Sequence, residues 1–106
     1  MSKPDLLKYI NKVKARIRRL GLDPTRLSIS NRKDKKYMYE LPNNKKIHFG
    51  AYGLNDYVMY LHDGNPEANI RRKAYQSRHE KVMLKNGVKA IDVKFSPAWF
   101  SWHVLW

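Results

Sequence analysis

The stretch KYMYELPNNKKIHFG, residues 36–50, decides the fold. Two β-prone runs, 37–41 and 46–50, flank the turn composition Pro42-Asn43-Asn44-Lys45. Apolar and aromatic residues on both sides of a Pro/Asn-rich turn are typical of a β-hairpin. We therefore predict a small antiparallel sheet built around this hairpin.

The hydrophobic pattern also predicts the register of the hairpin. With a three-residue loop at 43–45, Leu41 faces Ile47 and Tyr39 faces Phe49. All but one of the large apolar side chains then lie on one face of the sheet. A two-residue loop would place a charged side chain opposite Ile47, so we expect the three-residue loop.

Upstream of the hairpin, the spacing of apolar residues predicts an amphipathic helix over residues 3–20. Ser2 and Asp5 have the spacing of a capping box, and Gly21 supplies a stop signal. Intervals of four and three residues line one face of a helix. The apolar positions are Leu6, Ile10, Val13, Ile17 and Leu20.

Two segments connect this helix to the hairpin. Residues 27–30 predict a short strand, and residues 31–36 are too polar for any core. We expect the second segment to be a basic surface loop.

Downstream of the hairpin, two elements are expected before the C-terminal segment. An Asn-Asp pair can cap a short element over residues 57–61, which the pattern leaves open as helix or strand. An Asn-Pro start predicts a basic helix over residues 65–86 that stops at Gly87. Its apolar positions are Ile70, Ala74, Tyr75, Val82, Met83 and Leu84.

The C-terminal segment, residues 96–106, contains three tryptophans at helical spacing after a Ser-Pro start. They are Trp99, Trp102 and Trp106. Either they fill the core, since three indoles bury a large area, or they anchor the protein in a partner. Both interpretations stay open.

These elements together indicate an α+β fold, with an N-terminal helix (1–21), a strand and hairpin (27–50), a basic helix (65–86) and the Trp-rich segment. At 106 residues the chain is long enough for one modest core and too short for two. We therefore predict a single domain over residues 1–106.

The chain has 22 Lys and Arg against 9 Asp and Glu, a formal net charge of +13. Residues 1–36 carry +9, residues 37–64 carry −1 and residues 65–106 carry +5. Two basic limbs therefore flank a neutral middle. This self-repulsion favours an anionic partner, and DNA or RNA is the first expectation.

Several classes of protein are excluded or disfavoured. The absence of cysteine excludes a disulfide framework, a zinc–thiolate site and a thiol nucleophile. The N-terminus lacks a signal-peptide pattern, and no segment approaches the roughly 20 apolar residues that span a bilayer. We expect a protein that is not secreted and works in a virion or in the cytoplasm or nucleus of a host cell.

We expect the basic limbs to bind nucleic-acid backbones with little sequence preference, because no recognition-helix signature is present. About six to ten phosphate contacts would make the affinity fall by about three to five decades over a modest rise in salt. The expected contact residues are Lys8, Lys12, Lys14, Arg16, Arg18, Arg19, Arg32, Lys33, Lys35, Lys36, Arg71, Arg72, Lys73, Arg78 and Lys81.

The four histidines, His48, His62, His79 and His103, show no helical metal-pair spacing, so we expect no metal site and no cofactor. A weaker hypothesis takes the first three with Asp56 as a small nuclease centre, in which a histidine activates water. No acidic pair has motif-like spacing, and no phosphate-binding glycine loop is present. We therefore expect a binding protein without catalytic residues.

From residue 36 onward, the order of several short motifs resembles a family of small basic proteins of large DNA viruses of protists and algae. The resemblance covers about two-thirds of the chain. It implies a viral origin and a component of the virion, and no known catalytic activity. This sequence departs from the family pattern at Gly64-Asn65, since the pattern would have the basic helix begin directly after Asp63. The matching motifs are Lys36-Tyr37, the hairpin turn, His48-Phe49-Gly50, Gly53, Asp56-Tyr57, His62-Asp63, Arg78-His79 and Leu105-Trp106.

Two functions follow as hypotheses. The first is a nucleic-acid-binding protein that organises or packages a viral genome. The second is a minor capsid or cement protein, whose basic limbs dock on acidic neighbours and whose tryptophans fill a groove. A membrane surface is a weaker expectation.

Overall fold

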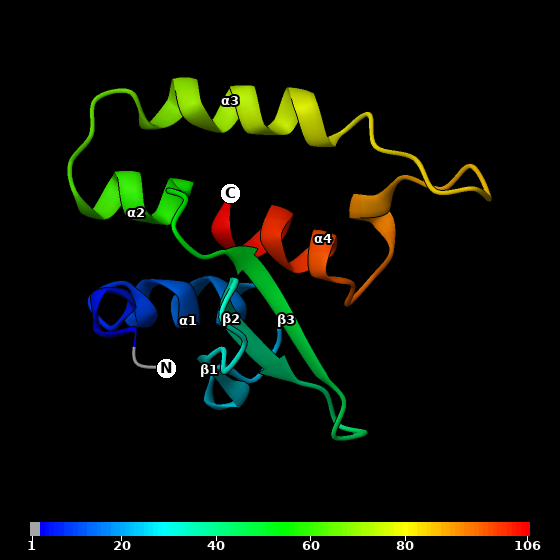
Figure 1. The fold of residues 1–106 in the computed structure, drawn as a ribbon, viewed down its shortest axis with the longest axis horizontal. Helices are drawn as coiled ribbons and strands as arrows, with labels where there is room; N and C mark the ends of the chain where they lie inside the picture. Colours follow the sequence, from blue (N-terminus) through cyan, green and yellow to red (C-terminus); the bar gives the residue numbers. More distant parts are fainter. Residues whose placement is uncertain (1–2) are drawn as a thin grey trace. The chain divides into compact units, whose positions relative to one another are not determined.

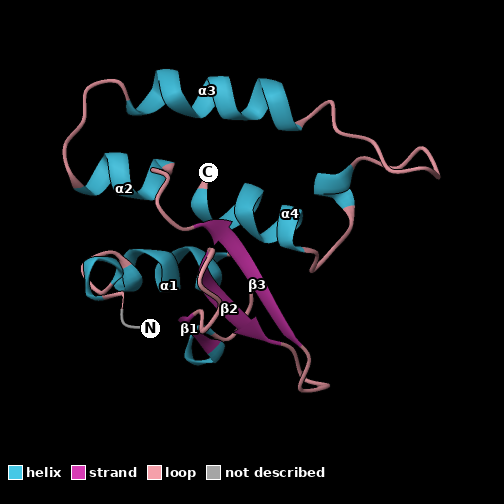
Figure 2. Ribbon diagram, viewed as in Figure 1, coloured by secondary structure: helices cyan, strands magenta, loops and turns pink. Residues whose placement is uncertain are grey.

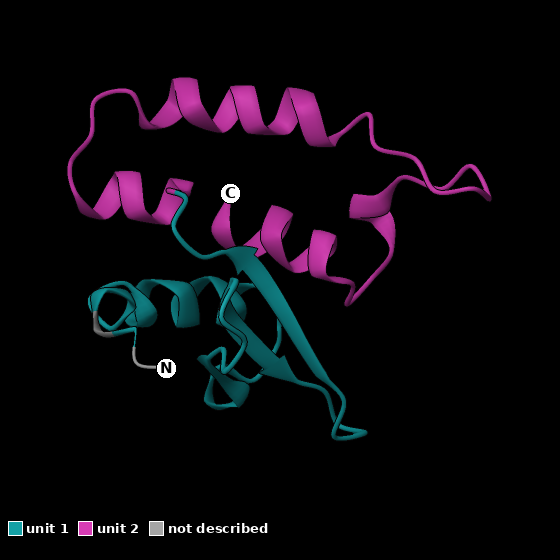
Figure 3. Cartoon of the chain, viewed as in Figure 1, with its two compact units in different colours: residues 1–54 teal, residues 55–106 magenta. Residues whose placement is uncertain are grey.

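The computed structural model describes residues 3–106 and confirms the α+β class (Figure 1). Ser2 of the predicted capping box lies outside this range. The chain divides into two compact units, residues 1–54 and residues 55–106 (Figure 3). All the named strands belong to the first unit, whereas the second is built from helices and loops (Figure 2). The prediction of one domain over residues 1–106 stays a prediction.

The N-terminal helix of unit 1 is shorter than predicted. Helix α1 spans Ile10–Arg19, and a 3-10 turn, Pro4–Leu6, precedes it. Backbone bonds from Leu6 N to Lys3 O (3.1 Å) and from Tyr9 N to Leu6 O (3.0 Å) wind this segment more tightly than an α-helix. The tighter winding buries both Leu6 and Tyr9, which explains why the predicted start at residue 3 is wrong.

Strands β1 (Leu27–Ile29), β2 (Lys35–Glu40) and β3 (Lys46–Ala51) form an antiparallel sheet in that order (Figure 1). The predicted short strand and hairpin are therefore confirmed. Val13 and Ile17 of α1 are fully buried and belong to the core of this unit. The sheet contributes its apolar face to that core through Leu27, Tyr37, Tyr39, Ile47 and Phe49.

The register of the hairpin differs by two residues from the prediction. Tyr39 pairs with Ile47, and Tyr37 pairs with Phe49. Because side chains alternate between faces with a period of two, this shift leaves every side chain on its predicted face. The predicted apolar face is confirmed, although the predicted partners are wrong.

The cause of the shift lies in the loop, which has three residues as expected but comprises 42–44. Leu41 N donates to Lys45 O, and Asn44 N donates to Leu41 O, both at 2.8 Å. Asn44 adopts a φ of 68°, the left-handed conformation that Asn tolerates. The predicted loop would have placed Lys45 at this position instead.

Unit 2 begins with two helices. Asp56 caps helix α2 (Tyr57–His62), since its Oδ1 accepts a hydrogen bond from Met59 N at 2.9 Å. The element left open as helix or strand is therefore a helix. The basic helix α3 follows as Ala68–His79.

Helix α3 ends at His79, and the predicted continuation to residue 86 is wrong. The chain instead turns back on itself, with Leu84 N donating to Val88 O at 2.8 Å. Gly87 closes this turn with a φ of 80°. The sequence pattern predicts a helix stop at Gly87, but Asn-Gly between β-prone residues is also a hairpin signal, and the structure has the hairpin.

The Trp-rich segment is helical, as predicted. Ser96 Oγ accepts a hydrogen bond from Trp99 N at 3.1 Å and so caps helix α4 (Pro97–Phe100). The chain continues as a π-helix, Ser101–Leu105. The buried residues of the Trp-rich segment are Phe100, Val104 and Leu105. Within the described residues, no helix combines the length and apolar character needed to cross a bilayer.

Candidate nucleic-acid interface

The positive charge of the chain is concentrated in unit 1. Residues 1–54 contain 14 Lys and Arg against 4 Asp and Glu, a formal charge of +10. Residues 55–106 contain 8 against 5, a formal charge of +3. The candidate interface is therefore assigned mainly to unit 1.

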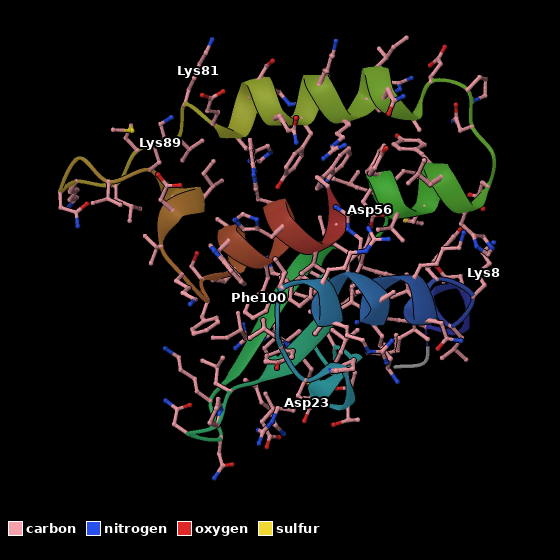
Figure 4. The ribbon with its side chains drawn as sticks, turned by 180° about the vertical axis from the view of Figure 1, so that it is seen from behind. Lys8, Asp23, Asp56, Lys81, Lys89 and Phe100 are labelled. Carbon is pink, nitrogen blue, oxygen red and sulfur yellow. The ribbon has the colours of Figure 1, made fainter. Side chains whose placement is uncertain are left out.

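Helix α1 carries five cations and no acid in ten residues. Three of them, Lys12, Arg18 and Arg19, are exposed, whereas Lys14 and Arg16 are half-buried. Cations in the last turn also interact favourably with the negative end of the helix dipole. Lys8 adds an exposed cation in the preceding turn and points away from the ribbon (Figure 4).

The basic loop between β1 and β2 is held by the buried side chain of Lys3. Its Nζ donates to the backbone carbonyls of Ser30 (2.8 Å), Arg32 (2.5 Å) and Lys35 (2.5 Å). Lys3 is 4% exposed and lies over the ring of Tyr52 at 5.2 Å. A charged donor that satisfies three carbonyls fixes the loop backbone. Sequence reasoning missed this role, since Lys3 is one of many basic residues in the N-terminal segment.

A second contact fixes the start of the same loop. Ser30 Oγ accepts from Arg32 N at 3.0 Å and lies 2.7 Å from Nδ1 of His48. Burial lowers the pKa of His48, and the nearby charges of Arg32, Lys46 and Lys3 lower it further. The neutral ring, when its proton is on Nε2, can therefore accept a hydrogen bond from the Ser30 hydroxyl through Nδ1. We call Lys3, Ser30 and His48 the loop latch.

The loop presents some of its predicted cations and hides one. Arg32 and Lys33 are exposed, and Lys35 is half-buried. Lys36 is only 2% exposed, although it lies in β2 on the sheet face opposite the core residue Tyr37. The prediction that the whole run 31–36 is a surface loop is therefore wrong at its end, and Lys36 is left out of the interface below.

The cations of unit 2 are partly neutralised. Arg71 pairs with Glu67 at 3.4 Å on the surface of α3. Arg72 lies over the ring of Tyr57, with Cζ 4.8 Å from its centroid. The remaining predicted cations are all exposed, and they are Lys73, Arg78 and Lys81. Unit 2 therefore offers a shorter basic surface than unit 1.

The four residues of the nuclease hypothesis have separate contacts or positions. His48 belongs to the loop latch, Asp56 caps α2, and His79 stacks on Tyr75 with ring centroids 4.0 Å apart. His62 is exposed at the end of α2. Among residues 3–106, the structure brings no three His, Asp or Glu side chains together in a metal-binding arrangement.

The three tryptophans do not share one set of contacts. Trp106 stacks on Tyr75 at 4.2 Å, and Trp102 lies 6.2 Å from the same ring. Trp99 contacts Phe95 (5.4 Å) and His103 (4.8 Å) instead. All three indoles are half-buried. Trp99 also lies 5.1 Å from the fully buried ring of Phe100, so each of the three indoles packs on a core aromatic side chain.

A shallow hollow of about 380 Å³ lies beside the outer face of the sheet. Its charged groups are of both signs, with Asp23 and Glu40 facing Arg26 and Lys46. Arg26 is also tied to Asp23 at 3.8 Å. This mixture does not suit a phosphate, so the hollow is not part of the interface.

A family model described as a family of unknown function, DUF5754, matches residues 25–79. The match covers just over half of the chain, and the protein belongs to this family. It includes the sheet, the basic loop and α3, but not α1. Searches among curated proteins and among solved structures gave no match.

Proposed function

We propose that this member of the DUF5754 family binds nucleic-acid backbones without sequence preference, mainly through unit 1. One observation carries the proposal: unit 1 has a formal charge of +10, its helix α1 has five cations and no acid, and Lys3 fixes the backbone of its basic loop. The proposed contacts in unit 1 are Lys8, Lys12, Lys14, Arg16, Arg18, Arg19, Arg32, Lys33 and Lys35.

Phosphate contacts supply affinity because each bound cation releases condensed counterions. Flexible cations lose conformational entropy on binding, and ordering a loop adds to this cost. The loop latch removes part of that cost in advance, since the backbone around Arg32 is already fixed. Backbone contacts position a protein on DNA or RNA but carry no sequence information.

The resemblance noted above supports a further part of the proposal. A chain with this motif order belongs, on our proposal, to a large DNA virus, and it organises or packages the genome in the virion or in the infected cell. Sequence-independent binding suits this role, because a packaged genome has to be bound along its whole length.

Mobility shifts at low salt with duplex DNA, single-stranded DNA and RNA test the proposal. We expect retention of all three. A triple variant in α1, with Lys12, Arg18 and Arg19 changed to Gln, should bind duplex DNA at least tenfold more weakly, because about three phosphate contacts are lost.

A matched variant in unit 2 provides the control, with Lys73, Arg78 and Lys81 changed to Gln. It removes the same number of exposed cations but should weaken binding less, since unit 2 carries +3 against +10. Equal losses in the two triple variants would contradict the assignment to unit 1. No retention of any nucleic acid by the unmodified chain would contradict the function itself.

The second candidate is a minor capsid or cement protein. The observation that favours it is Trp99, which is half-buried and lies outside the stack on Tyr75. A partly exposed indole of this kind can anchor an interface. The candidate fails if the protein is abundant in infected cells and absent from purified, nuclease-treated particles.

A further inference from the structure

A second hairpin projects from unit 2 beyond the end of α3 (Figure 1). Its two arms are joined by hydrogen bonds from Leu84 N to Val88 O (2.8 Å) and from Ala90 N to Val82 O (3.0 Å). The hairpin begins after residue 79, where the match to the DUF5754 family ends. The sequence pattern placed these residues in a helix, so their exposure emerges only from the structure.

The hairpin exposes four large apolar side chains. Val82 is 48% exposed, Met83 54%, Leu84 44% and Val88 40%. Val82 and Leu84 are two positions apart and lie opposite Ala90 and Val88, so these side chains share one face. Clustered apolar side chains on a surface mark a docking site more often than single ones do.

Lysines are sequence neighbours of the residues that form this apolar face. Lys81, Lys85 and Lys89 lie within the hairpin or at its base, and Lys81 and Lys89 are labelled in Figure 4. Glu80 and Asp92 are the acids nearby in the sequence, and Glu80 pairs with Lys89 at 3.4 Å. The hairpin therefore combines an aliphatic face with three lysines, which outnumber the two acids.

We infer that this hairpin docks on an anionic lipid surface. The aliphatic face enters the boundary between headgroups and acyl chains, and the lysines bind the negative headgroups. A lipid interface is both apolar and anionic, as this hairpin requires. A phosphate backbone offers nothing to the aliphatic side chains, and a second copy of the hairpin would bring like charges together.

This inference depends on hairpin residues of unit 2. Of these, only Lys81 is also an expected nucleic-acid contact. The inference is therefore tested separately. A chain that binds DNA and fails to bind vesicles contradicts the inference alone, and a chain with the opposite behaviour contradicts only the proposed function.

The first experiment is co-sedimentation of the full chain with phosphatidylcholine vesicles, with and without phosphatidylserine. We expect binding only when phosphatidylserine is present. A double variant, Leu84→Ser with Val88→Ser, should lower the partition coefficient by about tenfold or more, because two aliphatic side chains no longer leave water.

The matched control is the double variant Leu54→Ser with Ile70→Ser. It removes two aliphatic side chains that are 66% and 68% exposed and lie outside the hairpin. The control should bind vesicles like the unmodified chain. Unchanged circular dichroism and unchanged duplex DNA binding establish that both double variants are folded.

A second measurement detects insertion directly. Because the chain has no cysteine, Leu84→Cys and Leu54→Cys each accept a single environment-sensitive dye. Phosphatidylserine vesicles should shift the emission of the dye at residue 84 to the blue and leave the dye at residue 54 unchanged.

Three results would overturn the inference. The first is absence of binding to phosphatidylserine vesicles, and the second is equal binding by the two double variants, which would indicate attraction by charge alone. The third is a dimer in sedimentation that Leu84→Ser dissociates, which would assign the apolar face to a second copy of the chain.

Discussion

At the scale of single residues, the side chain of Lys3 does more for the architecture of unit 1 than the exposed cations around it. Its ammonium is buried and donates to three backbone carbonyls of the basic loop. Fully hydrogen-bonded burial is the condition under which a charged group is tolerated inside a protein. The loop in turn exposes Arg32 and Lys33, so a buried cation positions exposed ones.

The substitution Lys3→Met should lower the free energy of unfolding by about 2 kcal/mol, because the carbonyls that Nζ satisfies lose a charged partner. Met retains much of the aliphatic stem, so packing changes little. Urea denaturation measures the loss. Lys12→Met, at an exposed position of α1, should stay within about 0.5 kcal/mol of the unmodified chain. Equal stabilities of the two variants would contradict the latch.

A pH dependence follows from His48. Burial and the neighbouring Arg32, Lys46 and Lys3 lower its pKa in the folded chain below the usual 6.5, while Asp34 opposes them. The unfolded chain therefore binds more protons, so the stability from neutral His48 is complete above pH 6.5 and is lost as the pH falls towards the folded pKa. Unfolding free energies measured between neutral and acidic pH should decrease, with a smaller decrease in His48→Gln.

Part of the decrease should remain in that variant. Burial also lowers the pKa of His79 and of His103, and both act in the same direction. If the unmodified chain and His48→Gln lose stability in parallel over the whole range, the contribution of His48 is contradicted.

At the scale of elements, both units use the same hairpin loop. In loops 42–44 and 85–87, the third residue has a positive φ, Asn44 in one and Gly87 in the other. In both loops, the side-chain oxygen of the middle residue accepts a hydrogen bond from the backbone N–H two residues later. The distances are 3.0 Å for Asn43 and 3.1 Å for Asn86. This local chemistry sets the register of the first hairpin and ends α3 early.

The loop chemistry predicts opposite effects of two changes at one position. Asn44→Ala should lower the free energy of unfolding by about 1 kcal/mol, because Ala pays a steric cost at a φ of 68°. Asn44→Gly should leave the stability unchanged or slightly higher, since Gly has no such cost. Thermal unfolding distinguishes the two variants, and a stability of Asn44→Ala equal to that of Asn44→Gly would contradict the assigned loop.

The elements also show which parts of the fold could be predicted from the sequence. Strong local patterns gave the hairpin, its apolar face and the Ser96 cap of α4, because alternation and capping depend on near neighbours. The end of α3 was missed because an apolar run before a glycine fits both a helix and a hairpin. The latch was missed because it joins residues 18 or more positions apart.

At the scale of the whole molecule, most of the positive charge and the exposed apolar hairpin belong to different units. Unit 1 carries +10 and the proposed nucleic-acid surface, whereas unit 2 carries +3 and the exposed apolar hairpin. The cations of the candidate site could be predicted from the sequence, because composition shows the charge directly. The fixed conformation of the basic loop could not be predicted, because the carbonyls that hold the loop belong to the backbone.

The measurement that tests the central claim most directly is the salt dependence of duplex DNA binding. The account predicts a straight line of log affinity against log salt, with a slope of about −5 or steeper for six or more phosphate contacts. Replacing Lys12, Arg18, Arg19, Arg32 and Lys33 together by Gln should flatten that slope by about four. A slope near zero in the unmodified chain, or an unchanged slope in this variant, would contradict it.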